Sequence, residues 1–119
     1  RPFAPSILEE EVKNWFVKDC KSPFMSFVID ILEEKKKLIP AVTHVDGSGR
    51  LQSVSQQTNP LYYNLIKSFF LKTNVPILLN TSFNENEPIV CRPSEAIETF
   101  LKTKMDTLVM GNYVINRKK

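Results

Sequence analysis

The spacing of apolar positions changes along the chain, which predicts a mixture of helices and strands. Residues 1–6 carry two prolines and are expected to be extended, and Ser6 is a candidate N-cap because Glu9 follows three positions later. Apolar residues then recur at helical spacing, which predicts a helix over residues 7–18. The apolar, β-rich stretch 24–32 predicts a mostly buried strand.

The middle of the chain alternates between strand and helix patterns. Residues 41–45 and 50–55 flank an Asp-Gly-Ser-Gly sequence and predict a hairpin, because Asp-Gly between alternating apolar residues is a strong turn signal. An Asn-Pro pair opens the longest helical pattern, over residues 59–74. The continuous apolar run 75–80 then predicts a buried central strand.

The last part of the chain predicts a helix followed by a hairpin. Residues 93–104 begin with a proline that suits the first turn of a helix, and strands 107–110 and 113–116 flank a Gly-Asn turn. The order of elements predicts the α/β class, a twisted mixed sheet with helices packed on it, in a single domain over residues 1–119.

The composition is typical of an ordinary globular domain and excludes several classes of protein. Of 119 residues, 42% are hydrophobic and only 3 are Gly, which argues against disorder and against a collagen-like chain. No apolar run approaches the ~20 residues of a membrane span, so no membrane partner is expected. The net charge of +3 is too small and too dispersed to favour nucleic acid.

The two cysteines, Cys20 and Cys91, are far apart and have no histidine at metal-binding spacing. We expect them to be buried or half-buried free thiols in the reducing cytoplasm, with a disulfide as the alternative. The chain does not open with Met and shows no signal peptide, so we expect a piece of a longer cytoplasmic protein.

The first segment that could carry chemistry is 43–50. Its two glycines permit positive φ and close approach, and alternation would place His44 and Asp46 on one side of a strand. Arg50 offers a planar fork of donors for phosphate or carboxylate. The alternative is an ordinary hairpin in which His44 is a satisfied core histidine.

The second segment is 78–90, where an apolar strand runs into Asn, Thr, Ser and Asn. Ligands commonly bind at the carboxyl ends of strands in open α/β sheets, and these hydroxyls and amides can donate to phosphate oxygens and to a ribose. The alternative is an Asx-rich turn whose side chains bond their own backbone. The chain lacks the Walker loop and the GxGxxG, HExxH and GxSxG motifs, which removes support for those enzyme families.

Five spaced blocks carry a resemblance to a known family. They are Arg1-Pro2-Phe3-Ala4-Pro5-Ser6, Ser22-Pro23-Phe24-Met25, Pro40-Ala41-Val42-Thr43-His44-Val45-Asp46-Gly47, Asn59-Pro60 with Tyr63, and the stretch from Val75-Pro76 through Leu79-Asn80-Thr81-Ser82-Phe83-Asn84 to Glu87-Pro88-Ile89-Val90. Together they resemble the C-terminal domain of the O-carbamoyltransferases, which include nodulation-factor and antibiotic carbamoyltransferases. The resemblance covers essentially the whole chain.

The resemblance implies a YrdC-like fold, in which Thr81, Ser82 and Asn84 match a Thr-Ser-Ala-Asn segment. It also implies that carbamoyl phosphate and ATP, with Mg²⁺, give carbamoyl adenylate in this domain. The carbamoyl group would then pass to a substrate hydroxyl in an N-terminal ATPase-like domain of the same polypeptide, which holds a metal. That domain is the expected partner, and no metal ligand is expected in this chain.

The resemblance also implies roles for individual residues. Arg1 and Arg50 would clamp the carbamoyl phosphate, while the Thr81, Ser82 and Asn84 segment would hold the nucleotide phosphates and Mg²⁺-bound oxygens. His44 and Asp46 would orient Arg50, touch the carbamoyl group, or brace the hairpin.

One departure from the family sets an expectation about activity. A Lys-x-Arg stretch of the relatives would fall before Arg1, so we expect this chain alone to be catalytically silent. Two other kinds of function stay open: a non-catalytic nucleotide- or RNA-binding YrdC-like module, and a structural lid that completes the N-terminal domain.

Overall fold

The structure is a computed structural model that describes residues 3–118. The chain divides into two compact units, Arg1–Thr81 and Ser82–Lys119, and each is described by itself below. The single-domain organisation stays a prediction. No helix in the described part of the chain is long and apolar enough to cross a membrane.

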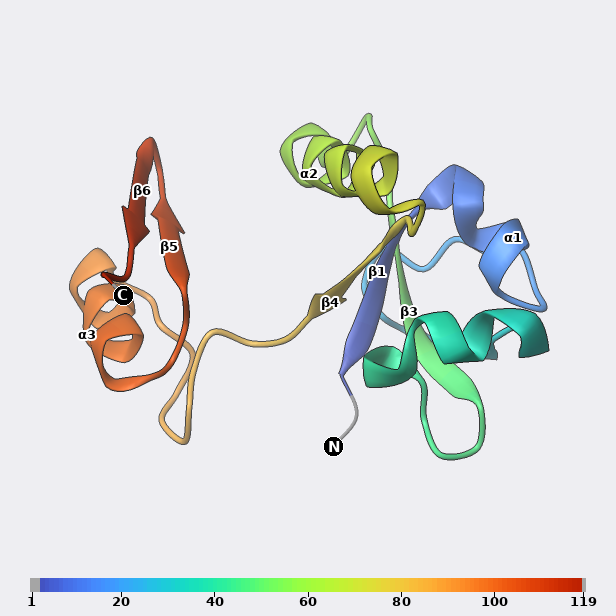
Figure 1. Cartoon of the computed structure of the whole chain (residues 1–119), viewed down its shortest axis with the longest axis horizontal. Helices are drawn as coiled ribbons and strands as arrows, with labels where there is room; N and C mark the ends of the chain where they lie inside the picture. Colours follow the sequence, from blue (N-terminus) through green and yellow to red (C-terminus); the bar gives the residue numbers. More distant parts are fainter. Residues whose placement is uncertain (1–2, 119) are drawn as a thin grey trace. The chain divides into compact units, whose positions relative to one another are not determined.

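A four-stranded mixed sheet forms the centre of the first unit (Figure 1). Its strands are β1 (Ala4–Leu8), β2 (Phe27–Asp30), β3 (Ser48–Val54) and β4 (Ile77–Asn80), in the order β2-β3-β1-β4. β1 is parallel to β3, whereas the β1–β4 and β2–β3 pairs are antiparallel. The mixed sheet confirms the predicted α/β class.

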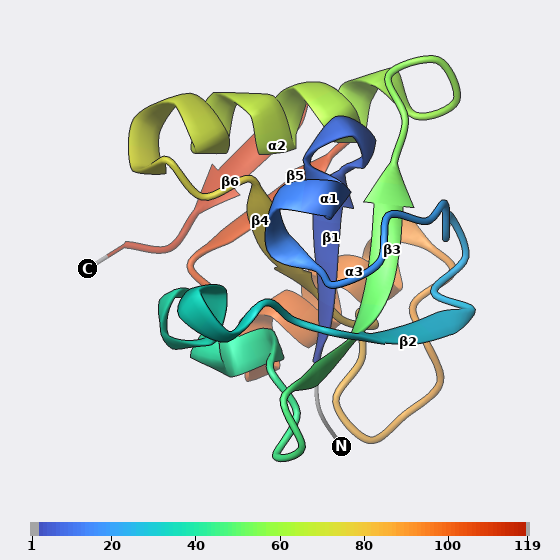
Figure 2. The same ribbon diagram turned by 90° about the vertical axis from the view of Figure 1, so that its right-hand side faces the viewer.

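The direction of the strands decides which segments share an end of the sheet. Ala4, at the start of β1, pairs with Asn80, at the end of antiparallel β4. Ser6 pairs with Gln52 in parallel β3, and the same register continued two residues back sets Arg50 level with Ala4. The starts of β1 and β3 therefore lie at the same end as the end of β4, as both views show for the first two strands (Figures 1 and 2).

The longest helix, α2 (Pro60–Thr73), confirms the prediction for residues 59–74. It has Pro60 in its first turn and ends at Asn74, whose φ of 63° gives the left-handed cap that often stops a helix. Tyr63 and Ile66 are its buried residues, and they pack on the sheet with Leu8 and Val54.

A second core cluster fills the other side of the unit around four short helical segments. These segments are α1 (Val12–Trp15), which follows the 3₁₀ turn η1 (Glu9–Glu11), and the 3₁₀ turns η2 (Glu33–Leu38) and η3 (Pro40–Val42). The buried residues of this cluster are Ile7, Val12, Trp15, Phe16, Ile31, Ile39, Val42, Leu51 and Ile77.

The predicted helix over residues 7–18 is wrong. Ile7 and Leu8 belong to strand β1, in which all five residues are buried, and the helical segment spans only Glu9–Glu11 and Val12–Trp15. Ser6 is not an N-cap, because its hydroxyl donates to Gln52 Oε1 at 2.5 Å. Pairing in the middle of the sheet buries these apolar residues more completely than one helix face would, which overrides the local period.

Three strand predictions also need correction. β2 covers only part of residues 24–32 and is largely exposed at the edge of the sheet, with Phe27 and Val28 both more than half exposed. Residues 41–45 form no strand, because Pro40 starts a 3₁₀ turn there and a reverse turn follows it. β4 is an edge strand rather than a central one, although it does fall within the predicted residues 75–80.

The second unit confirms the last three predicted elements. α3 (Pro93–Lys102) precedes the antiparallel strands β5 (Thr107–Met110) and β6 (Tyr113–Asn116). Gly111 has a φ of 59° in the turn between them. The unit's buried cluster consists of Ala96, Phe100 and Leu108.

Candidate functional site

A tight turn from His44 to Ser48 leads directly into β3. The Gly47 amide donates to the His44 carbonyl at 2.9 Å, and the His44 amide donates to the Ser48 carbonyl at 2.7 Å. Gly47 takes a φ of +87°, a conformation that side chains with a Cβ rarely adopt. The turn therefore depends on glycine, and it fixes the spacing between the side chains at its two ends.

The side chains of this turn form a chain of hydrogen bonds. Ser48 donates from its hydroxyl to Asp46 Oδ1 at 2.6 Å and from its amide to the same oxygen at 3.0 Å. These two bonds, the hydroxyl first, hold the pKa of Asp46 below its ordinary value. On its other side, Ser48 Oγ lies 3.1 Å from His44 Nδ1.

His44 and Asp46 do come together, but not on one side of a strand as predicted. A turn joins them through Ser48, which is buried. The remaining ring nitrogen, His44 Nε2, is buried and has no hydrogen-bond partner among the described residues. The alternative of a satisfied core histidine therefore does not describe His44.

Arg50 lies two residues beyond this turn, on β3 opposite Val28 of β2. Its side chain is exposed, and within residues 3–118 it makes no hydrogen bond or ion pair. Neither His44 nor Asp46 orients it. The guanidinium is free to bind an anion from solution.

Strand β4 ends at the same end of the sheet. Asn80 donates from its side chain to Gln52 Oε1 at 2.8 Å, and the same oxygen accepts the Ser6 hydroxyl. This link joins β4, β1 and β3 through side chains. Thr81 follows as an exposed residue and is the last of the first unit.

The second unit opens with the predicted Ser82 and Asn84. Ser82 donates to Asn84 Oδ1 at 2.6 Å, and Asn84 Nδ2 donates to the Glu87 carbonyl at 2.7 Å. The segment therefore forms the Asx-rich turn that the sequence left as the alternative. Its hydroxyl and amide donors bond within the loop.

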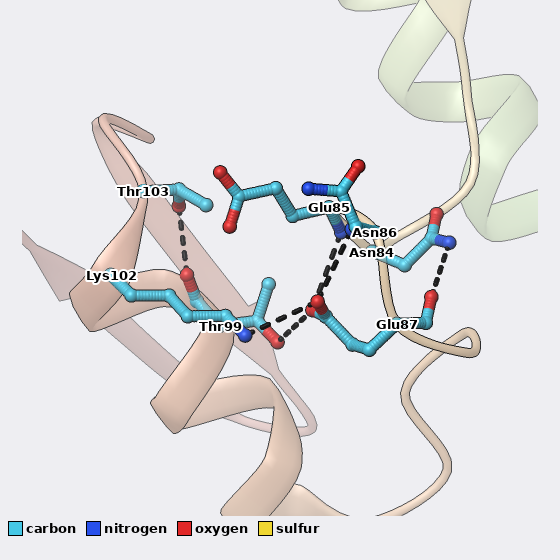
Figure 3. A network of polar contacts seen from close by, with 7 residues as sticks. All are labelled: Asn84, Glu85, Asn86, Glu87, Thr99, Lys102 and Thr103. Atoms are coloured by element: carbon cyan, nitrogen blue, oxygen red, sulfur yellow. Dashed lines mark hydrogen bonds and ion pairs between the residues drawn. The ribbon is translucent and has the colours of Figure 1, made fainter.

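The Glu87 carboxylate sits at the centre of this loop (Figure 3). It accepts hydrogen bonds from the amides of Glu85 at 3.3 Å and Asn86 at 3.2 Å and from the Thr99 hydroxyl at 3.4 Å. It also forms an ion pair with Lys102 at 3.2 Å. Its own backbone amide, followed by the Lys102 bond and the two preceding amides, lowers the pKa of Glu87 to about 2. The loop is thus built around an anion supplied by the chain itself.

No group of three or more His, Cys, Asp or Glu side chains in the described part of the chain could hold a metal ion. Cys20 and Cys91 are both free, as predicted, and Cys20 is half-buried, but the predicted burial is wrong for Cys91, which is exposed. Arg1, which was predicted to bind an anion, lies outside the described residues.

Comparison with known proteins assigns the chain to a family. The family described as "Carbamoyltransferase C-terminus" matches residues 1–117. The chain belongs to this family. It is 51% identical over 122 residues to nodulation protein NolNO of Sinorhizobium fredii, which covers 99% of the chain and 18% of that relative.

Two other members show the range of the carbamoyltransferase C-terminal family. Nodulation protein NolO of Bradyrhizobium diazoefficiens is 49% identical over 99% of the chain and 22% of its own length. The 3'-hydroxymethylcephem-O-carbamoyltransferase of Amycolatopsis lactamdurans is 33% identical over 94% of the chain and 21% of its own length. The chain thus spans about a fifth of the curated relatives it matches.

Two residues that organise the candidate site of this carbamoyltransferase C-terminal domain, Ser48 and Glu87, were not predicted from the sequence. Ser48, the link between His44 and Asp46, follows a turn glycine, and its contact with His44 depends on a turn where the sequence predicted a strand. Glu87 stands in the polar loop after β4, where no motif distinguishes its carboxylate, and its partner Lys102 lies on a different element. The only local signal for Glu87 is a run of Asn and Glu residues that favours turns.

Proposed function

We propose that this chain is the C-terminal part of an O-carbamoyltransferase. In this role it helps to form carbamoyl adenylate from carbamoyl phosphate and ATP, for transfer to a substrate hydroxyl. The family match and a relative named as an O-carbamoyltransferase support the reaction class. The observation that carries the proposal is structural: the direction of the strands gathers the His44 to Ser48 turn, the free Arg50 and Thr81 at one end of the sheet.

Arg50 is the residue best suited to bind carbamoyl phosphate. Its fork can hold two oxygens of a phosphate at once, and charge-assisted bonds of this kind are about twice as strong as neutral ones. Since Arg50 has no partner to give up among the described residues, binding an anion breaks no bond within the domain. Arg1 would contribute a second cation.

Ser82 and Asn84 have groups of the right kind to hold ATP phosphates, a hydroxyl and an amide. Their donors bond to Asn84 Oδ1 and to the Glu87 carbonyl, so a phosphate would replace these bonds rather than add to them. A dedicated Mg²⁺ site does not fit the described residues, which present no cluster of carboxylates. Mg²⁺ commonly binds through substrate phosphates and few protein ligands, and we assign it no step here.

The proposed partner is an N-terminal ATPase-like domain of the same polypeptide, which would hold its own metal and the hydroxyl acceptor. The relatives leave room for it, because they extend over about five times the length matched here. The cytoplasm, where ATP and carbamoyl phosphate are made, is the proposed location.

The test is pyrophosphate release from ATP by the full-length protein, with and without carbamoyl phosphate. We expect release to require carbamoyl phosphate and to fall at least about tenfold in Arg50→Ala, since a bond to a charged group contributes about 1.5–3 kcal/mol. Asn84→Ala should also reduce it. Lys72→Ala, which removes an exposed cation at the last turn of α2, is the matched control and should keep full activity.

The other outcomes point to the alternative functions. No release while ATP still binds would favour a non-catalytic nucleotide- or RNA-binding module. An Arg50→Ala variant that loses stability but keeps its affinity for carbamoyl phosphate would favour a structural lid.

A further inference from the structure

The hydrogen bonds around Ser48 determine which nitrogen of His44 carries a proton. Asp46 has a lowered pKa and is ionised at neutral pH, so its carboxylate only accepts hydrogen bonds. The single hydroxyl proton of Ser48 therefore points to Asp46 Oδ1, at 2.6 Å. Ser48 Oγ is left to accept, and the nitrogen facing it at 3.1 Å, His44 Nδ1, must be the donor.

A neutral imidazole with its proton on Nδ1 has a bare lone pair on Nε2. That atom is buried, and no donor among the described residues reaches it. Buried polar atoms of proteins are nearly always hydrogen-bonded, so an atom without a partner calls for an explanation, such as backbone strain, a catalytic role, or a bound water or ion. In the neutral ring, Nε2 is thus an acceptor of fixed direction, because the buried Ser48 holds the other ring nitrogen.

The chemistry of Nε2 selects the kind of group it can meet. A bare lone pair repels a phosphate oxygen, and the negative charge of Asp46, at the other end of this series of hydrogen bonds, adds to that repulsion. A neutral N–H group is complementary to it. Carbamoyl phosphate carries such a group, the amide –NH₂ at the end opposite its phosphate.

We infer that Ser48 is a positioning residue that holds His44 in the Nδ1–H tautomer, so that Nε2 accepts a hydrogen bond from the carbamoyl –NH₂. The statement about the ligand rests on the proposed function, whereas the statement about the tautomer rests on the geometry alone. The arrangement gives Arg50 and His44 separate tasks, the phosphate end and the amide end of one substrate. It also lets the site bind carbamoyl phosphate more tightly than acyl phosphates that lack an N–H group.

The tautomer can be observed directly, because His44 is the only histidine of the chain. Nitrogen-15 NMR of the imidazole at alkaline pH distinguishes a protonated from a bare ring nitrogen. We expect a protonated Nδ1 and a bare Nε2 in the wild type, a shift towards the Nε2–H form in Ser48→Ala, and recovery in Ser48→Thr, which keeps a hydroxyl. Ser68→Ala, an exposed serine on α2, is the control and should leave the spectrum unchanged.

The ligand half is tested by calorimetry on the full-length protein with carbamoyl phosphate and acetyl phosphate, which has a methyl in place of –NH₂. We expect the wild type to prefer carbamoyl phosphate at least tenfold. Ser48→Ala should lose most of that preference with little change in acetyl phosphate affinity, and Ser48→Thr should restore it.

Each outcome overturns a different statement. A protonated Nε2 in the wild type, or a Ser48→Ala spectrum identical to the wild type, overturns the positioning role. Equal affinity of the wild type for the two acyl phosphates, or a preference that survives in Ser48→Ala, overturns the contact between His44 and the amide. A wild type that binds neither compound overturns the proposed function instead, while the NMR result still decides the tautomer.

Discussion

A single hydrogen bond ties α2 to the turn that follows β1, and removing it tests how the first unit is held together. The Tyr63 hydroxyl donates to the Glu10 carboxylate. The Tyr63 ring packs with Leu8, Val54 and Ile66 in the cluster between helix and sheet. Tyr63→Phe removes the hydroxyl and keeps the ring, so it isolates the hydrogen bond from the packing.

The expected size of the effect follows from the surroundings of the two groups. A hydrogen bond to a charged acceptor contributes about 1.5–3 kcal/mol. Glu10 is exposed, so water hydrates its carboxylate in the variant and no stranded charge adds to the loss. We therefore expect the free energy of unfolding to fall by about 1.5 kcal/mol, the lower end of that range.

The raised pKa of Tyr63 sets an upper limit on that value. The bond to Glu10, followed by burial and the charges of Glu10 and Glu9, raises this pKa from 10.0 to about 12. At about 1.4 kcal/mol for each unit, the rise sets an upper limit near ~3 kcal/mol. Because the pKa is raised on folding, this stabilisation is complete below pH 10 and is lost as the pH rises to about 12.

The assay is urea unfolding followed by the fluorescence of Trp15, the chain's single tryptophan, which is buried in the same unit. Wild type and Tyr63→Phe should differ by the full amount at neutral pH and converge between pH 10 and about 12. Tyr62→Phe is the matched control, because Tyr62 is half-buried and its hydroxyl makes no hydrogen bond within residues 3–118. A loss below ~0.5 kcal/mol for Tyr63→Phe, or a difference that persists unchanged through the phenol's titration, would refute the reasoning.

Three further predictions test the turn, the loop and the second unit. Gly47→Ala should lower the free energy of unfolding by about 1–2 kcal/mol in the same fluorescence assay, because φ is +87° at this position, and Gly47→Asn should lower it less. Equal urea midpoints for the wild type and Gly47→Ala would show that the turn does not need glycine. The amide NMR signals of Glu85 and Asn86 should titrate with the Glu87 pKa of about 2. Because this pKa is lowered on folding, the carboxylate stabilises the loop fully above pH 4.5 and loses this effect as the pH falls through 2. A titration midpoint near 4.5 would show that the amides do not stabilise the carboxylate. Arg117 donates to the Phe100 carbonyl at 2.5 Å and stacks over that ring at 4.5 Å, so Arg117→Lys should speed amide exchange at the end of α3, whereas Lys118→Ala should not.

The parts of the fold that sequence predicted correctly are those with local stop and start signals. α2 is bounded by Asn59-Pro60 and Asn74, and the β5–β6 hairpin surrounds Gly111. Such signals act through the backbone of a few neighbouring residues, although burial can override them, as it does for the Ser6 and Glu9 capping pattern at β1. The strand β1 has no signal that marks it as a strand, because its apolar residues also match a helix and only burial in the sheet decides between the two.

The candidate site divides in the same way. Arg50, His44 and Asp46 could be selected from the sequence because their residue types suit anions and proton transfer. The hydrogen bonds that connect His44 to Asp46 could not be predicted, because they pass through Ser48 and depend on a turn where a strand was predicted. Glu87 shows the same limit, since its ion pair comes from Lys102, 15 residues along the chain and on another element.

The convergence of the first unit's site residues has a simple topological cause. In a purely parallel sheet, the end of β4 and the start of β3 would lie at opposite ends, and the carboxyl-end rule would exclude Arg50 from a site that contains Thr81. β4 runs antiparallel to β1, which reverses its direction and brings its carboxyl end to the amino end of β3. The Gln52 side chain, bonded to both Ser6 and Asn80, links the three strands near that end. Reversal of one edge strand thus brings the turn before β3 and the last residues of β4 to the same end of the sheet.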